Sequence, residues 1–315
     1  MTTKATKKTE ENLPATVAEG SVPAELMGLG SGAGMENTTS SDVDIPRILL
    51  LQAGSPQVED GEEPGTFYHT ILEENVGTPI IGKNAKGKEM VEGYSLTFVP
   101  IAVTSDYVLW NPRHDGGGIL DRAPLFDAKK GLYKWNNPGA EYEVHPEKDS
   151  ERKVVWKTGE FVGKNRDLAK WGTFDPNNTN KQRPAATLTY YILGVLPDRP
   201  ELGPMLFIFS RSQVKVARSI ISTLKLRASS HNLDIYASKF KLTSFNASNE
   251  DGDLFKNMKQ APSGFITKDE FPTYRDIYEQ YEGFSLSDDA LDKAQGDVDD
   301  AATTGGSASD DDEEF

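Results

Sequence analysis

Two nearly continuous apolar runs stand near the middle of the chain, at residues 187–196 (TLTYYILGVL) and 205–210 (MLFIFS). Their β-branched and aromatic content, and the Pro- and Gly-containing segment between them, predict two strands joined by a turn. Strands that are apolar on both faces are typical of the middle of a sheet. We therefore expect these two strands at central positions.

Shorter apolar or alternating runs predict further strands on either side of this pair. They lie at residues 45–52, 66–72, 94–103, 107–110, 235–245 and 253–259. The polar residues 104–106 separate the run at 94–103 from the run at 107–110, which indicates one bent or bulged strand or a hairpin. Residues 82–88 (GKNAKGK) are expected to form a loop, and residues 262–264 (PSG) a turn.

Two segments have the pattern of helices. In residues 213–227 one face is apolar, with Val214, Ala217, Ile221 and Leu224, and another carries the bases Arg211, Lys215, Arg218 and Lys225. The second helix is expected over residues 268–281, with Pro272 near its start.

The remaining segments show little periodicity. Residues 1–44 and 286–315 are rich in small and charged residues, so both are expected to be disordered. Residues 119–183 predict a long insertion with short β pieces near 133–135 and 154–161. The body, residues 45–285, is thus expected to be one mainly β (α+β) domain with two helices. We expect an elaborated, partly open barrel of the oligonucleotide/oligosaccharide-binding (OB) type, and a β-sandwich fits the strand count nearly as well.

The formal charge of −15 is unevenly distributed. Residues 286–315 contribute −10 and residues 1–44 contribute −4, which leaves the body at −1. Within the body, residues 129–183 carry +4 and residues 211–259 carry +5. Two basic stretches on a nearly neutral body indicate a surface that binds a polyanion.

Several kinds of site are disfavoured. The chain has no cysteine, and its four histidines show no metal-ligand spacing, so we expect no metal, no cofactor and no disulfide. His114 and Asp115, beside three glycines, are a weak candidate for general base catalysis, and we expect the protein not to be an enzyme. No apolar run is long enough to cross a bilayer, so a cytoplasmic location is expected.

Aromatic and basic residues alternate between residues 131 and 174, where three of the four tryptophans stand next to a lysine. Bases stack on aromatic rings and cations bind phosphates, so this mixture is typical of a groove for single-stranded nucleic acid. The alternatives are tryptophans in a core and, for the first helix, a solvated face. The candidate nucleic-acid-binding residues are Trp110, Arg113, Tyr133, Lys134, Trp135, Trp156, Lys157, Lys164, Arg166, Lys170, Trp171, Arg211, Lys215, Arg218, Lys239 and Lys241. Lys239 and Lys241, two apart on a strand, are expected to share one face.

The last six residues are five acids and a phenylalanine: Asp310, Asp311, Asp312, Glu313, Glu314 and Phe315. Behind a low-complexity linker and a β-rich body, this ending resembles the acidic tail of single-stranded DNA-binding proteins of bacteria and their phages. Glu314 departs from the proline that bacterial members carry before the final phenylalanine. Stretches such as DIPRILLLQAGSP and YVLWNPR also resemble proteins of tailed phages.

The resemblance implies that the protein coats single-stranded DNA during phage replication, recombination or repair. It also implies that the tail recruits replication or recombination proteins, such as a polymerase, helicase or primase, and occupies the DNA groove when DNA is absent. A homo-oligomer is compatible with it. The alternative is a virion or assembly protein with a solubilising acidic arm.

Overall fold

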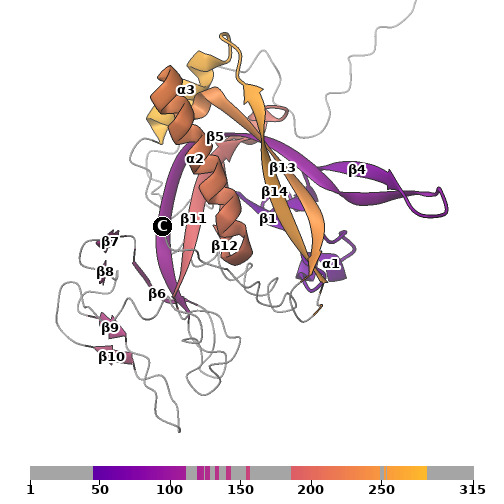
Figure 1. Ribbon diagram of the computed structural model, residues 1–315, viewed down its shortest axis with the longest axis horizontal. Coiled ribbons are helices and arrows are strands. Elements are labelled where there is room, and N and C mark those ends of the chain that lie inside the picture. The colour runs from indigo at the N-terminus through magenta and orange to yellow at the C-terminus, as the bar shows by residue number, and fades with distance from the viewer. Residues whose placement is uncertain are drawn as a thin grey trace, which may run out of the picture. The chain divides into compact units, whose positions relative to one another are not determined.

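A computed structural model describes residues 45–110, 119–123, 125–127, 132–134, 140–142, 154–156, 186–248, 252 and 254–281 (Figure 1). The elements before residue 111 are β1 (Arg47–Leu50), α1 (Pro56–Glu59), β2 (Phe67–His69), β3 (Glu74–Asn75), β4 (Thr78–Lys83) and β5 (Glu89–Trp110). The short strands that follow are β6 (Ile119–Ala123), β7 (Leu125–Asp127), β8 (Leu132–Lys134), β9 (Ala140–Tyr142) and β10 (Val154–Trp156). The last elements are β11 (Ala186–Val195), β12 (Met205–Ser210), α2 (Val214–His231), β13 (Ser238–Ser248), β14 (Leu254–Phe265) and α3 (Phe271–Gln280).

Ten strands form one sheet, which is organised around the 22-residue strand β5. The order along the sheet is β14-β13-β5-β11-β12-β1-β2-β3, and β4 and β6 also pair with β5. All of these pairings are antiparallel except that of β1 with β12. Two hairpins, β7–β8 and β9–β10, form separate two-stranded sheets. A strand as long as β5 can pair with different strands along its length, and these additional pairings widen the sheet.

The sheet is curled into an open half-barrel, and α2 lies on its inner face (Figure 1). One core cluster combines side chains from opposite ends of the strand order, such as Phe67 of β2 and Met258 of β14, with Ala217 and Ile220 of α2. Residues so far apart in the strand order share one cluster because the sheet curls around them. The ring of Phe98 stacks on that of Phe207 with centroids 4.4 Å apart.

The outer face carries a second core cluster under α3. Val99 of β5 and Leu193 of β11 pack there with Tyr236 and Tyr274. A reciprocal pair of hydrogen bonds with the pattern of a capping box orders the turn just before α3: the Thr267 N–H donates to Glu270 Oε2 (2.6 Å), and the Glu270 N–H donates to Thr267 Oγ1 (3.3 Å). The backbone N–H of Thr267, more than any other group, holds the pKa of Glu270 below its ordinary value. Along β5 and β11, side chains of the inner core, such as Phe98 and Ile192, thus stand next to side chains of the outer core, such as Val99 and Leu193.

The side chain of Gln52 closes part of the opening between the two ends of the sheet. Its Nε2 donates to the carbonyl oxygen of Lys256 on β14 (3.0 Å), and the Lys256 N–H donates to its Oε1 (2.8 Å). The amide thus bonds to an edge strand as a neighbouring peptide group would. A side chain, and not a strand pairing, joins the segment after β1 to β14.

The structure confirms a mainly β class with a barrel-like, open sheet and few helices. The described strands form one curled sheet and two hairpins, so the β-sandwich alternative is wrong. The central positions of β11 and β12 and the two predicted helices are confirmed, although Ile220 and not Ile221 is buried in α2. The predicted disorder of residues 1–44 and 286–315 concerns residues outside the described part, as does most of the insertion.

Three predictions about strands are settled or corrected by the structure. Residues 94–110 are one continuous strand, because Thr104, Ser105 and Asp106 pair with β11 throughout, so the single-strand alternative is confirmed and the hairpin is wrong. Of the expected loop at residues 82–88, residues 84–88 form a tight turn as predicted, whereas Gly82 and Lys83 belong to the end of β4. The expected turn at residues 262–264 belongs to β14, where Pro262 is tolerated because β14 is an edge strand with irregular register.

Candidate functional site

Lys239 and Lys241 lie on the outer face of β13, as predicted. They alternate with Phe240 and Leu242, which are buried in the inner core. Lys239 Nζ lies 3.4 Å from Glu270 Oε1 at the start of α3, so its charge is partly neutralised. Lys241 is exposed. Of the two predicted bases, Lys241 is therefore better placed to meet a ligand.

The pairing of β13 with β14 brings two further side chains to the face that already carries Phe245 of β13. Lys259 pairs with Thr243, and Phe255 pairs with Ala247, so both point outward. Lys259 becomes a diagonal neighbour of Lys241, and Phe255 a diagonal neighbour of Phe245, at about 7 Å. We call Lys241, Lys259, Phe245 and Phe255 the outer ribbon face. The lysines are exposed and the rings are half-buried.

Sequence reasoning missed Lys259, Phe245 and Phe255. The alternation in KFKLTSF at residues 239–245 was recognised, but residues 254–261 could not be assigned to the same face without the pairing register. Two alternating runs separated by a short polar segment were the available signal for a hairpin.

The basic residues of α2 lie on the other side of the sheet. Ala217, Ile220 and Leu224 bury the helix on the inner face, and Arg218 and Lys225 point away from it into solvent. Lys215 is also exposed, whereas Arg211 is half-buried and has a positive φ of 53°. The α2 bases and the β13 lysines therefore do not share one face of the sheet.

Most other candidate residues cannot be placed as side chains. Trp110 ends β5, Tyr133 and Lys134 belong to β8, and Trp156 ends β10, and only their backbone is described. The candidates outside the described residues are Arg113, Trp135, Lys157, Lys164, Arg166, Lys170, Trp171 and the tail residues Asp310, Asp311, Asp312, Glu313, Glu314 and Phe315, together with His114 and Asp115. Their roles stay predictions.

A row of buried polar side chains lies on the outer face at the far end of β5. Asp106 of β5 pairs with Thr189 of β11, and Arg122 of β6 pairs with Val108 of β5, two residues further on. All three polar residues are buried, Arg122 at 3% exposure. Buried charges are normally paired. Backbone pairing of β5 with β11 and with β6 keeps this polar segment inside the strand.

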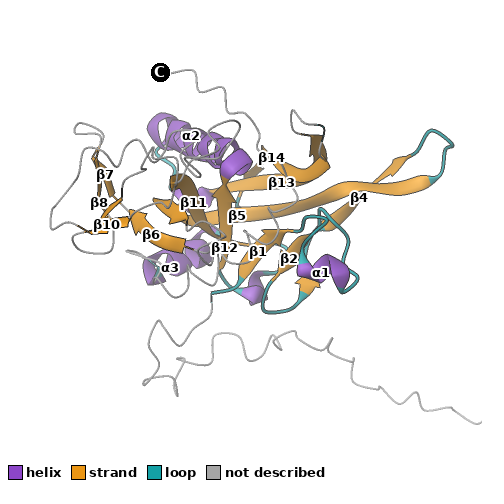
Figure 2. Ribbon diagram, turned by 90° about the horizontal axis from the view of Figure 1, so that it is seen from below, coloured by secondary structure: helices purple, strands orange, loops and turns teal. Residues whose placement is uncertain are grey.

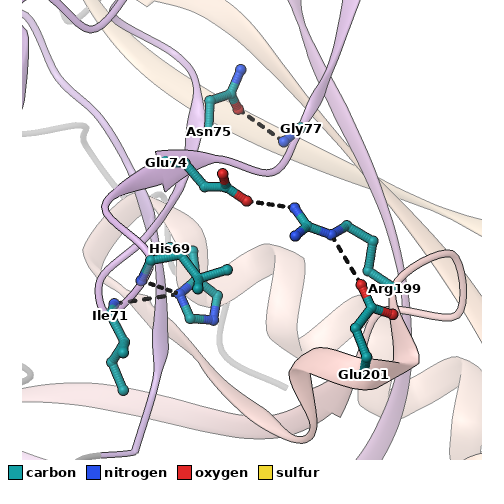
Figure 3. A network of polar contacts seen from close by, with 8 residues as sticks. His69, Ile71, Glu74, Asn75, Gly77, Arg199 and Glu201 are labelled. Carbon is teal, nitrogen blue, oxygen red and sulfur yellow. Dashed lines mark hydrogen bonds and ion pairs between the residues drawn. The ribbon is translucent and has the colours of Figure 1, made fainter. Parts of the chain in front are cut away.

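His69 organises a second polar site, at the end of β2 (Figure 3). Its imidazole is 3% exposed, and Nδ1 accepts hydrogen bonds from the N–H groups of Ile71 (3.3 Å) and Leu72 (3.1 Å). Nδ1 can accept only when it carries no proton, so the proton of the neutral ring is on Nε2. Burial, before any other cause, lowers the pKa of His69. The residue is therefore a neutral structural histidine that shapes the turn after it.

Next to this turn, Arg199 joins the β11–β12 connection to β3. Its Nη1 lies 2.6 Å from Glu74 Oε1, and its Nε lies 3.4 Å from Glu201 Oε1 (Figure 3). The hydrogen bond to Glu74 is the main reason that the pKa of Arg199 is raised. The pair with Glu74 is 40% and 47% exposed, so it contributes little to stability.

The described residues contain no group of three or more His, Asp or Glu side chains placed to hold a metal ion. Within the same ranges, no helix is both long and apolar enough to cross a membrane.

Comparison with known proteins gives one family. No curated protein matches the chain, and no solved structure does. The family described as Pam3 phage gp34-like protein matches residues 17–286, which include the whole curled sheet and its helices. Since this match covers far more than half of the sequence, the chain belongs to the Pam3 phage gp34-like protein family.

Proposed function

We propose that this phage-family protein binds single-stranded DNA on the outer ribbon face. The observation that carries the proposal is the placement of Lys241 and Lys259 beside Phe245 and Phe255 on one side of two paired strands. Cations bind phosphates without regard to sequence, and each base stacked on an aromatic ring contributes about 1–3 kcal/mol. The proposal assigns the protein no chemistry, metal or cofactor.

The half-barrel supports the same function at the level of the fold. We infer that it is an elaborated barrel of the OB type, since such folds present open, curved β surfaces to oligonucleotides. In this account the α2 bases are a solvated face that adds only to the long-range field. The aromatic residues between 131 and 174 extend the binding surface.

The acidic tail acts as a competitor and a recruiting segment in the proposed mechanism. Its five carboxylates resemble a strand of phosphates, so it rests on basic surfaces until DNA displaces it and frees Phe315 for replication or recombination proteins. Removing residues 310–315 should therefore strengthen DNA binding several-fold at low salt and abolish recruitment.

The experiment is a titration of labelled oligothymidine, with and without the tail, followed by anisotropy and by tryptophan quenching. We expect saturable binding of single strands, weaker binding of the duplex, and tighter binding by the tailless chain. No shift in either signal at low salt would exclude DNA binding.

A second function is favoured by a different observation. The β4–β5 hairpin exposes aliphatic side chains on both of its faces. Such surfaces are typical of assembly contacts, so we also propose, as the alternative, a structural role in phage particle assembly. It predicts co-purification with particles and indifference to oligothymidine.

A further inference from the structure

The hairpin formed by β4 and the first part of β5 extends as an arm from the curled sheet (Figures 1 and 2). It pairs from Thr78 opposite Ser95 to Lys83 opposite Glu89. In the described part of the chain, β5 pairs with β13 only from Ser95 onward, so the arm is two-stranded. A lone two-stranded ribbon is only marginally stable in water.

Two aliphatic side chains of the arm are exposed on opposite faces. Ile81 pairs with Val91 and is 56% exposed, and Met90 pairs with Gly82 and is 49% exposed. Because Ile81 and Gly82 are neighbours on a strand, their partners point to opposite sides. The arm therefore offers apolar surface to a partner that contacts both of its faces.

The tip of the arm has a net positive charge, although Glu89 stands opposite Lys83, and it ends in an ordered turn. Lys83, Lys86 and Lys88 stand within six residues. The side-chain oxygen of Asn84 accepts hydrogen bonds from the N–H groups of Lys86 (2.9 Å) and Lys88 (3.0 Å). The backbone N–H of Asn84 also donates to Lys88 O (2.9 Å), and Gly87 takes the positive φ of 75° that the turn requires. The lysines are thus presented on an ordered turn, which reduces the entropy cost of binding.

A surface of complementary character lies around the turn after β2. Ile71 and Leu72 are 54% and 42% exposed, although buried His69 holds both of their N–H groups. Glu73 follows with a positive φ of 54°, a conformation that costs a non-glycine residue about 1 kcal/mol. A strained turn that fixes two aliphatic residues in solvent is suited to contact a partner.

Acidic residues lie on this side of β2. Glu73 belongs to the turn itself, and Val58, which stands just before Asp60 and Glu62 in the chain, packs against the cluster that contains Tyr68. After burial, the charges of Glu73, Glu62 and Asp60 raise the pKa of Tyr68, in agreement with this placement. We call Ile71, Leu72, Glu73, Glu62 and Asp60 the acidic turn patch. It pairs apolar surface with negative charge, whereas the arm pairs apolar surface with positive charge.

The arm cannot cover the patch of its own chain. Glu73 precedes β3, and β4 starts at Thr78, so the patch lies near the base of the arm. The six residues of β4 carry the tip roughly 17–20 Å away from that base. We propose that the arm of one copy of this chain binds the acidic turn patch of a second copy. Such a head-to-tail contact forms an open filament or a ring, because it uses two different surfaces.

A charge-swap experiment on the full-length chain tests the proposal by analytical ultracentrifugation at low salt. The arm variant is Lys83→Glu/Lys86→Glu/Lys88→Glu, and the patch variant is Asp60→Lys/Glu62→Lys/Glu73→Lys. We expect wild type to self-associate and each variant alone to be monomeric. A mixture of the two should associate, and a chain carrying all six changes should self-associate again. The variant Lys225→Glu/Lys268→Glu, changed elsewhere on the surface, should behave as wild type.

Cross-linking supplies a second measurement, since the chain has no cysteine of its own. Met90→Cys and Leu72→Cys chains should form a disulfide-linked dimer when mixed and oxidised, and Met90→Cys should not cross-link to Lys225→Cys. Circular dichroism checks that all variants fold.

A monomeric wild type at high micromolar concentration, or assemblies that the arm variant leaves intact, would overturn the proposal. Loss of oligothymidine binding in the arm variant, with unchanged mass, would also overturn it and assign the arm to DNA. The proposal does not depend on DNA binding.

Discussion

At the scale of single residues, His69 links protonation to folding. The imidazole is buried, its Nδ1 accepts two backbone hydrogen bonds, and burial lowers its pKa below its ordinary value of about 6.5. The unfolded chain therefore takes up a proton before the folded chain does. The stability that neutral His69 contributes is complete well above its ordinary pKa of about 6.5 and is lost as the pH falls through that value and toward the lower pKa of the folded state.

We predict that the free energy of unfolding of wild type falls between pH 7 and pH 5.5, with His69 contributing up to about 1.4 kcal/mol per pH unit. His69→Gln should cost about 1–3 kcal/mol at pH 7.5, because Nδ1, the acceptor that the Ile71 and Leu72 N–H groups share, is lost, and it should flatten the slope of stability against pH. Urea unfolding at several pH values checks this. The matched control is His231→Gln, at the exposed end of α2. Parallel pH curves for wild type and His69→Gln would contradict the assignment.

Gly93 shows how a single residue fixes the approach of two strands. A Cβ at this position would collide with the backbone oxygen of Ser244 on β13. The next residue, Tyr94, donates its N–H to Ser244 Oγ at 2.8 Å in a buried hydrogen bond. Only glycine at position 93 allows the backbone of β13 to approach β5 this closely. The close approach fixes the position of β13, which carries part of the outer ribbon face.

At the scale of elements, the closure of the half-barrel depends on Gln52. Its amide makes two hydrogen bonds to the backbone of Lys256. Gln52→Ala should lower stability by about 2 kcal/mol and speed hydrogen exchange of the Lys256 amide, because the edge of β14 is then open. Gln52→Glu keeps the oxygen that accepts from the Lys256 N–H but loses the Nε2 donor. The Lys256 amide of this variant should therefore exchange more slowly than that of Gln52→Ala. Equal exchange in all three chains would show that Gln52 does not hold the edge.

Strand and helix prediction succeeded where the pattern was locally complete. β12 was predicted within its observed bounds, and β11 to within a residue at each end, because both faces of these strands are apolar. Prediction failed where the partner decides the structure. Asp106 lies inside a strand because Thr189 pairs with it, and β4 forms because β5 pairs with it. No property of GKNAKGK alone distinguishes a hairpin tip from a loop.

The candidate site could be predicted only in part for the same reason. The common face of Lys239 and Lys241 follows from alternation within one strand. Lys259 joins that face through a cross-strand register, and the register is a long-range property. The separation of the α2 bases from this face depends on which side of the sheet the helix covers, which periodicity does not specify.

At the scale of the whole molecule, charge is separated between surfaces. The body of residues 45–285 is nearly neutral, yet it presents lysines on the outer ribbon face and at the arm tip, and acids on the acidic turn patch. DNA binding and self-association would therefore use different surfaces. Cooperative coating of a strand follows if both operate, since neighbouring copies would contact each other while bound.

The central claim is that the outer ribbon face binds single-stranded DNA, and its most direct test is the salt dependence of oligothymidine binding by paired variants. Lys241→Gln/Lys259→Gln should bind about tenfold more weakly at low salt and lower the slope of log K against log salt by about 1.4. Arg218→Gln/Lys225→Gln removes the same charge from the exposed side of α2 and should change affinity less than about threefold. Equal losses in the two variants, or a larger loss in the α2 variant, would contradict the account.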